Sequence, residues 1–183
     1  MKLHVVDGDH NDLYAFYGRT DVPRCPSCRN LIDKWNADYI QVEVPTSMRM
    51  DISMTYDGVT IVSARFVQVV TDNKLRGLRF HDVGDGVSVL LANRRIAFDS
   101  VSRRTKFENQ CSRCGQYEAV AGATPAFLCP PVDVARDEFV WTDVEFGSGD
   151  EKGPLLICGD VAGAALRREK LKGLDRFAEV RGL

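Results

Sequence analysis

The chain has 183 residues, of which 44% are apolar and 27% charged, a balance typical of a folded protein that buries a core of its own. Its formal net charge of −2 disfavours a general binder of nucleic acid or of anionic membrane surfaces, because affinity for phosphate requires an excess of positive charge. The sequence contains no apolar run of the length of a signal peptide or a membrane span. We therefore expect a single domain over residues 1–183, located in the cytoplasm and without membrane association.

The first part of the chain contains two segments with strand character. Residues 2–6 are mostly apolar and are followed by a cluster of Asp, Gly, His and Asn residues that is typical of a turn. Residues 36–44 alternate between apolar and polar side chains, and Pro45 follows them. The pattern predicts a strand over residues 36–44.

Two cysteine pairs with the spacing Cys-x-x-Cys lie far apart in the sequence, at Cys25 and Cys28 and at Cys111 and Cys114. A spacing of two residues lets one tight turn present both sulfurs to a single tetrahedral metal ion, and two such turns complete a four-cysteine site. The pattern predicts a structural Zn²⁺ site that joins distant parts of the chain, like the site of a zinc ribbon. Four thiolate ligands would leave no open position for a substrate.

The residue after each pair differs. Gly115 follows the second pair and can adopt the left-handed backbone conformation that such a turn requires. Arg29 stands at the corresponding position of the first pair and is followed by Asn30. We expect either a different turn there or a left-handed conformation at Asn30.

Two other interpretations of the cysteines remain open. A Cys-Pro-x-Cys sequence also occurs in dithiol redox pairs, although those pairs begin a helix after a buried strand, whereas an exposed loop sequence precedes Cys25. The four thiols could also be free and unrelated. Cys129 and Cys158 are single, and we interpret both as small buried apolar residues, with metal ligation as the alternative.

An internal repeat is visible in the second and fourth quarters of the chain. Residues 61–78 align without gaps on residues 157–174, and both segments end in Lys-Leu-(Arg/Lys)-Gly-Leu. Each copy predicts a short strand, a helix that begins near Ser63 or Asp160 and stops at Gly77 or Gly173, and a further strand. We expect two related units over residues 61–83 and 157–180.

Between these units, Gly84-Asp85-Gly86 predicts a hairpin that joins strands at residues 78–83 and 87–91. Residues 96–98 and 117–120 also have strand character. The whole pattern predicts an α+β fold: an antiparallel-rich sheet with two helices, formed by pseudo-duplicated halves that the four-cysteine site joins.

The two cysteine pairs, the sequence of residues 139–150 (Phe-Val-Trp-Thr-Asp-Val-Glu-Phe-Gly-Ser-Gly-Asp), Pro-Leu-Leu-Ile at 154–157 and Lys-Leu-Lys-Gly-Leu at 170–174 form a distinctive combination. In these motifs the chain resembles the double-CxxCG motif proteins. These proteins are paralogous in myxobacteria and are grouped with the immunity proteins of a contact-dependent toxin-exchange system. The resemblance implies a cytoplasmic protein that binds and neutralises a cognate toxin, with the four cysteines holding a metal.

The acidic segment around residues 133–150 also contains large aromatic residues. Alternation along an extended segment would place Phe139, Trp141, Asp143 and Glu145 on one side, where they would form a partner-binding surface for a basic toxin. The competing interpretation is that Phe139 and Trp141 belong to the core, because large aromatic residues are mostly buried.

A second function class is a zinc-ribbon module that binds nucleic acid or regulates another protein. Its support is a short basic cluster: Arg94, Arg95, Arg103, Arg104 and Lys106. Such charges are also common on exposed strand edges. The sequence contains no nucleophile elbow, phosphate-binding glycine loop or His-Glu-x-x-His motif, so we do not expect an enzyme.

Overall fold

A computed structural model describes residues 2–44 and 50–181 of the chain. The fold is α+β, with a large and mostly antiparallel sheet. The strands are β1 (Leu3–His10), β2 (Ile52–Met54), β3 (Thr60–Ser63), β4 (Leu78–Gly84), β5 (Val87–Ala92), β6 (Arg95–Ile96), β7 (Lys106–Gln110), β8 (Tyr117–Ala121), β9 (Phe139–Ser148), β10 (Gly153–Gly159) and β11 (Leu174–Glu179). The helices are α1 (Ala64–Asp72), the short α2 (Ser100–Arg103) and α3 (Asp160–Arg168), with 3-10 turns at Ala37–Tyr39 and Gly149–Glu151.

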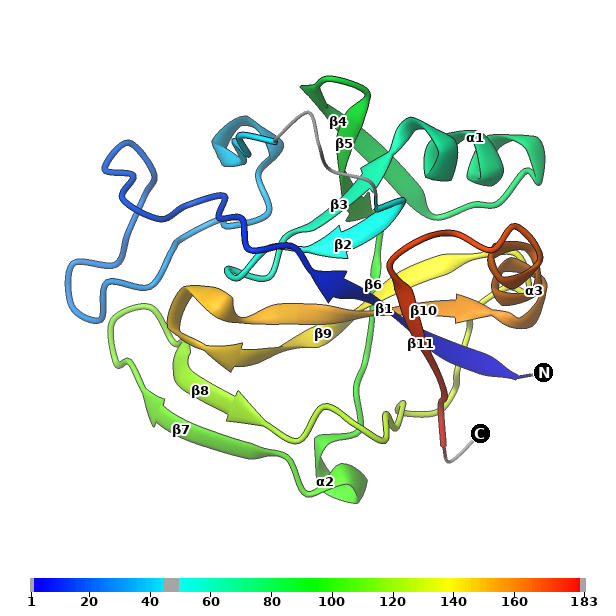
Figure 1. The fold of residues 1–183 in the computed structure, drawn as a ribbon. Coiled ribbons are helices and arrows are strands. Elements are labelled where there is room, and N and C mark those ends of the chain that lie inside the picture. The colour runs from blue at the N-terminus through cyan, green and yellow to red at the C-terminus, as the bar shows by residue number, and fades with distance from the viewer. Residues whose placement is uncertain (1, 45–49, 182–183) are drawn as a thin grey trace.

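The strands follow the order β4-β5-β3-β2-β1-β10-β9-β8-β7, and off this path β11 also pairs with β1 and β6 with β9. Helices α1 and α3 lie at one end of the molecule, and long loops extend from the opposite end (Figure 1). The two longer helices are those predicted from the repeated segments. Among the described strands, the parallel pairings are β1 with β2 and β6 with β9.

The same order of elements occurs twice, over a longer range than the repeated sequence indicated. A first repeat runs from β1 through a Cys-x-x-Cys turn to β2, β3, α1 and β4. A second repeat runs from β5 and β6 through the other turn to β9, β10, α3 and β11, and it contains in addition α2, β7 and β8 around that turn. Pairing registers also correspond: Ile61 and Ile157 face valines of β5 and β1, respectively.

The two repeats exchange their last strands. Strand β4 of the first repeat pairs with β5 of the second, and β11 of the second pairs with β1 of the first. Strands β3 and β10 cross in the same reciprocal way, to β5 and β1. Because each repeat completes the sheet of the other, the chain cannot be divided into two separate units.

The repeated glycines have a different role from the predicted one. Helices α1 and α3 end at Asp72 and Arg168, and the left-handed residues after them are Lys74 and Lys170. Gly77, further along the chain, lies so close to another strand that a Cβ atom there would be 2.0 Å from the carbonyl oxygen of Phe139.

Gly173 occupies the corresponding position in the second repeat, where a Cβ atom would be 2.2 Å from the Ile52 carbonyl oxygen. Both glycines have positive φ, 90° at Gly77 and 82° at Gly173. The glycines therefore permit a close backbone approach between the repeats, and the helix stop predicted at these positions is wrong.

The predicted strand over residues 36–44 is also wrong. Asn36 caps a 3-10 turn at Ala37–Tyr39, and its side chain accepts a hydrogen bond from the Asp38 N–H. Ile40 and Val42 are nevertheless buried, so the alternation reflects burial of one side of an irregular segment.

The core has two parts. The larger surrounds Phe66, Leu90, Phe139 and Trp141, between α1, α3 and the sheet. The smaller lies around Ile157 and Phe98 on the other side of the sheet. Both faces of β10 are therefore buried, consistent with its continuous apolar sequence.

Candidate metal centre

The two Cys-x-x-Cys turns are here called the first knuckle (residues 24–31) and the second knuckle (residues 110–117). The first lies in the long connection between β1 and β2, and the second joins β7 to β8. Figure 1 places both at the end of the molecule opposite α1 and α3. Cys25 follows β1 at the same distance along the chain as Cys111 follows β6.

Each knuckle closes with the same two backbone hydrogen bonds. The N–H of Arg29 donates to the carbonyl of Cys25 at 2.9 Å, and the N–H of Gly115 donates to the carbonyl of Cys111 at 2.8 Å. The N–H of each leading cysteine in turn donates to the carbonyl five residues later, in Asn30 or Gln116. The knuckles are therefore two copies of one turn.

The conformation of the first knuckle differs from both alternatives predicted from its sequence. Arg29 itself is left-handed, with φ of 67°, close to the 75° of Gly115. The turn thus keeps its shape without glycine, at the cost of placing a Cβ atom in a conformation that L-residues rarely adopt. Asn30 is not among the residues with positive φ.

The knuckles are tied to each other by a reciprocal pair of side-chain amides. Gln116 donates from Nε2 to the carbonyl of Leu31 at 2.8 Å, and Asn30 donates from Nδ2 to the carbonyl of Tyr117 at 3.4 Å. Each amide belongs to the residue five positions after the first cysteine of its own knuckle. It donates to the carbonyl of the residue six positions after the first cysteine of the other knuckle. Sequence reasoning missed this pair, although both amides occupy the same position in the motif.

The four sulfurs of Cys25, Cys28, Cys111 and Cys114 lie within 4.8 Å of one another. Sγ of Cys25 is 3.9 Å from that of Cys111, and Sγ of Cys28 is 3.6 Å from that of Cys114. A tetrahedral zinc ion with Zn–S bonds of about 2.3 Å separates its sulfurs by about 3.8 Å. The spacing therefore fits a metal-bound set of four cysteines and is too long for disulfides.

The site shifts the pKa values of two of its cysteines in opposite directions. The backbone N–H groups of Cys114 and Arg113 lower the pKa of Cys111 to about 6. At Cys28 the N–H of Asn30 acts in the same direction, but burial and the three neighbouring thiols raise its pKa to about 12. Thiols packed this closely cannot all ionise unless a cation compensates their charge. A divalent cation would hold all four as thiolates.

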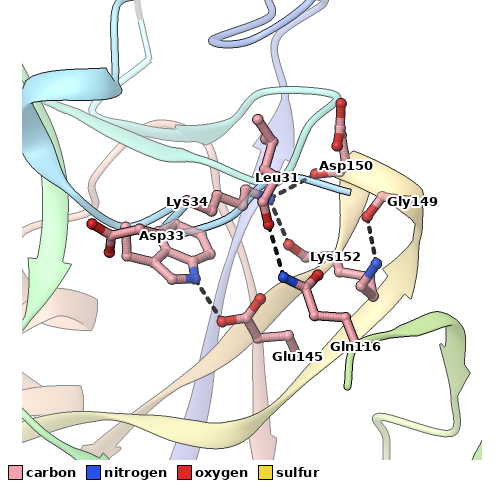
Figure 2. A pocket seen from close by; sticks show the side chains of 9 residues that line it. Leu31, Asp33, Lys34, Gln116, Glu145, Gly149, Asp150 and Lys152 are labelled. Carbon is pink, nitrogen blue, oxygen red and sulfur yellow. Dashed lines mark hydrogen bonds between the residues drawn. The ribbon is translucent and has the colours of Figure 1, made fainter. Parts of the chain in front are cut away.

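A buried lysine, three residues after the first knuckle, holds the turn between β9 and β10. The Lys34 ammonium donates to the carbonyls of Asp57, Asp150 and Lys152, at 2.5, 2.7 and 2.5 Å. Figure 2 shows its amino group pointing toward the carbonyls of Asp150 and Lys152, beside the Gln116 amide that reaches Leu31. Three carbonyl acceptors saturate an ammonium group.

Burial lowers the pKa of Lys34 to about 8, and Glu145, Asp57 and Asp150 oppose this effect. The β9–β10 turn is also held by the residue before Cys25, because Arg24 pairs with the Asp150 carboxylate at 2.8 Å. The β9–β10 turn is thus fixed through its backbone by Lys34 and through the Asp150 side chain by Arg24 of the first knuckle.

The predicted partner-binding residues do not form one exposed surface. Phe139 is fully buried and Trp141 is 5% exposed, which matches the alternative that both belong to the core. Glu145 accepts hydrogen bonds from Trp35 and Arg95, and the Asp143 carboxylate accepts the N–H of Phe98.

The basic cluster is partly neutralised. Arg94 pairs with Glu138 at 2.8 Å and Arg95 with Glu145 at 2.7 Å. Arg103 donates to the carbonyl of Thr124. These contacts leave Arg104 and Lys106 with their charges toward solvent, a small footprint for phosphate binding.

The remaining cysteines lie apart from the cluster. Cys158 is fully buried in β10, and burial raises the pKa of its thiol to about 12. Cys129 is half-buried, and burial raises its pKa as well. Within the described residues, neither belongs to the group that could hold a metal.

No protein-family model and no curated protein matches the chain. In the described part of the chain, every helix is too short or too polar to cross a membrane.

Proposed function

We propose that the chain is a toxin-neutralising immunity protein, in which a structural Zn²⁺ bound by Cys25, Cys28, Cys111 and Cys114 fixes the binding surface. The observation that carries the structural role of the metal is the set of four cysteines itself. Four thiolates fill a tetrahedral coordination shell, so the ion would bind neither a water molecule nor a substrate.

The position of the site supports the same role. The knuckles come from different repeats, the first in the long β1–β2 connection and the second between the exposed strand β7 and β8, where a metal adds cross-links that a core does not supply. Lys34 and Arg24 then transmit this rigidity to the β9–β10 turn. The chain uses its buried charges for such contacts, which supports a binding protein over an enzyme.

Neutralisation of a toxin is supported by the motif resemblance and by the acidic balance of the chain. Immunity proteins act by covering a toxin, and a partner with a basic surface would be attracted by complementary charge. The partner in this proposal is a cognate toxin protein.

The test is to sequence the neighbourhood of the gene for this chain and to co-express the chain with any toxin that an adjacent gene encodes. Cells that carry both genes should survive and cells that carry the toxin alone should die, and a complex of the two proteins should be recovered with zinc at one equivalent per chain. Failure to protect, with the protein folded and zinc-loaded, would disprove the immunity role.

A nucleic-acid-binding module makes a different prediction. Fluorescence anisotropy with single- and double-stranded oligonucleotides would show affinity that falls steeply with salt. Tight, salt-dependent binding without protection would replace the proposed function with this one.

A further inference from the structure

We propose that the partner docks on an exposed group of tyrosines beside the β9–β10 turn, and that this surface receives arginine or lysine side chains of a protein. The group, here called the tyrosine shelf, consists of Tyr14, Tyr17 and Tyr56. This inference rests on the proposed function for the identity of the partner, but the chemistry of the surface is independent of it.

The shelf is unusually exposed for its size. Tyr17 is 80% exposed, Tyr14 47% and Tyr56 41%. The ring of Tyr14 lies 5.0 Å from that of Tyr17 and 5.2 Å from that of Tyr56, measured between centroids. Aromatic residues gathered on a surface in this way are typical of the anchor points of protein interfaces.

The residues that line the cleft beside the shelf include three acids, Asp57, Asp150 and Glu151. Tyr14 and Tyr17 form one wall of a cleft of about 420 Å³, and Ser148, Gly149, Asp150 and Glu151 of the β9–β10 turn line the other. Among the described residues, the cleft lining contains acidic side chains and neither lysine nor arginine. On the far side, Asp12 accepts a hydrogen bond from the Tyr56 hydroxyl at 2.5 Å.

The charges in this cleft are not equally available. The Asp57 carboxylate is used internally, by the N–H groups of Ala15 and Phe16 and by the Thr55 hydroxyl. Asp150 pairs with Arg24. Glu151 is exposed, and no hydrogen bond or ion pair engages its carboxylate within the described parts of the chain. It is the acid best placed to receive a cation from outside.

The exposed tyrosine rings and the Glu151 carboxylate together favour one kind of binding partner. A guanidinium or ammonium group is attracted to the face of a tyrosine ring and to a nearby carboxylate at the same time. Nucleic acid could stack bases on the rings, but its phosphates would be repelled by the acids of the cleft. A basic protein segment therefore fits both the tyrosine rings and the acidic side chains, whereas nucleic acid fits the rings alone.

Two tyrosines of the shelf share a connection of the chain with the first knuckle and with Lys34. Tyr14 and Tyr17 lie in the same β1–β2 connection as the first knuckle, and Lys34 of that connection binds the carbonyls of Asp57 and Asp150. Lys34 therefore ties Asp57 and Asp150 of the cleft lining together, and Arg24, the residue before Cys25, pairs with Asp150.

A first experiment uses the protection assay. Tyr17→Ala and Glu151→Lys should each weaken the complex with the toxin by about tenfold or more and reduce protection. Matched controls on the exposed strand β7 are Phe107→Ala, which removes an exposed aromatic, and Glu108→Lys, which reverses an exposed charge. Zinc content and circular dichroism establish that each variant is folded. Full protection by both shelf variants would place the interface elsewhere and overturn the inference while leaving the immunity role intact.

A second experiment needs no toxin. The zinc-loaded protein, carrying ¹³C-labelled tyrosine rings, is titrated with a peptide of alternating glycine and arginine and, separately, with one of alternating glycine and glutamate. The arginine peptide should shift the ring signals of Tyr14, Tyr17 and Tyr56, while those of Tyr39 and Tyr117 stay in place. Glu151→Lys should abolish the shifts and Glu108→Lys should not.

Equal shifts with both peptides, or none at the shelf, would contradict the inference. Stronger binding of a thymidine oligonucleotide at the same rings would contradict it too. This titration does not depend on protection. Lack of protection with the ring shifts present would contradict the immunity role and not the docking surface. Absence of the ring shifts would contradict the docking surface and not the immunity role.

Discussion

The two repeats of the chain form the same local structures with partly different residues. Each contains a knuckle closed by the same hydrogen bonds and, after its helix, a glycine pressed against the other repeat. The second knuckle has Gly115 at the left-handed position, whereas the first has Arg29. Arg24 adds an ion pair to the first knuckle, and Gln110 at the corresponding position adds none. The features that both repeats share are those that the fold requires. The features that differ are specific to one knuckle and are not required by the fold.

The largest expected effect is loss of the metal, which should affect both repeats equally. Cys25→Ser and Cys111→Ser should each abolish stoichiometric zinc binding and lower the free energy of unfolding by at least about 3 kcal/mol, because the free energy of metal binding contributes to folding. Elemental analysis and denaturant titration are the measurements. Cys129→Ser, outside the cluster, is the control and should keep its zinc. If a chelator left the melting temperature of the unmodified protein unchanged, the metal would have no structural role.

The next effect tests the contacts between the repeats. Gly77→Ala and Gly173→Ala should each cost about 3 to 5 kcal/mol, since the added Cβ atom collides with a backbone carbonyl and the φ angle is positive. Thermal and urea unfolding measure the loss.

Gly84→Ala separates the two causes, because φ there is 97° but the added Cβ atom would meet open space. It should cost only about 1 kcal/mol. Equal losses at all three glycines would show that backbone conformation alone matters and that the close approach does not.

Exchanging the left-handed residues should give effects of opposite sign. Gly115→Ala should destabilise the zinc-loaded protein by about 1 kcal/mol, with no steric contribution because the site is open. Arg29→Gly should stabilise it by about 0.5 kcal/mol, since relief of strain at φ of 67° outweighs the greater freedom of glycine in the unfolded chain. Both values come from urea unfolding at constant zinc. A loss of stability in Arg29→Gly would mean that the arginine side chain contributes more than its backbone conformation costs.

An effect of similar, small size concerns the residue before the first cysteine of each knuckle. Arg24 and Gln110 both donate a side-chain hydrogen bond, at 3.0 Å, to the carbonyl of the left-handed residue of their own knuckle. Arg24→Ala should cost about 0.5 to 1 kcal/mol more than Gln110→Ala, because Arg24 also pairs with Asp150. A double-mutant cycle of Arg24→Ala with Asp150→Ala isolates the pair. A coupling energy near zero would assign the difference between the knuckles to something other than this ion pair.

Local chemistry was visible in the sequence. The spacing of the four cysteines predicted their common site, and the Lys-Leu-x-Gly-Leu echo predicted two strand–helix–strand units, because metal ligation and helix periodicity depend on neighbours within a few residues. The α+β class and the hairpin between β4 and β5 followed from the same local signals, and the structure has both.

Long-range contacts decided the rest. The exchange of β4 and β11 between the repeats, the close approach of Gly77 to Phe139 and the burial of Phe139 and Trp141 depend on partners far away in the chain. The left-handed conformation of Arg29 likewise contradicts its own local preference, because the knuckle must match its partner around four sulfurs. The sequence by itself thus determined which residues can hold a metal and which segments can form helices. Only the tertiary structure decided which surfaces face solvent, since burial is a property of the packed whole.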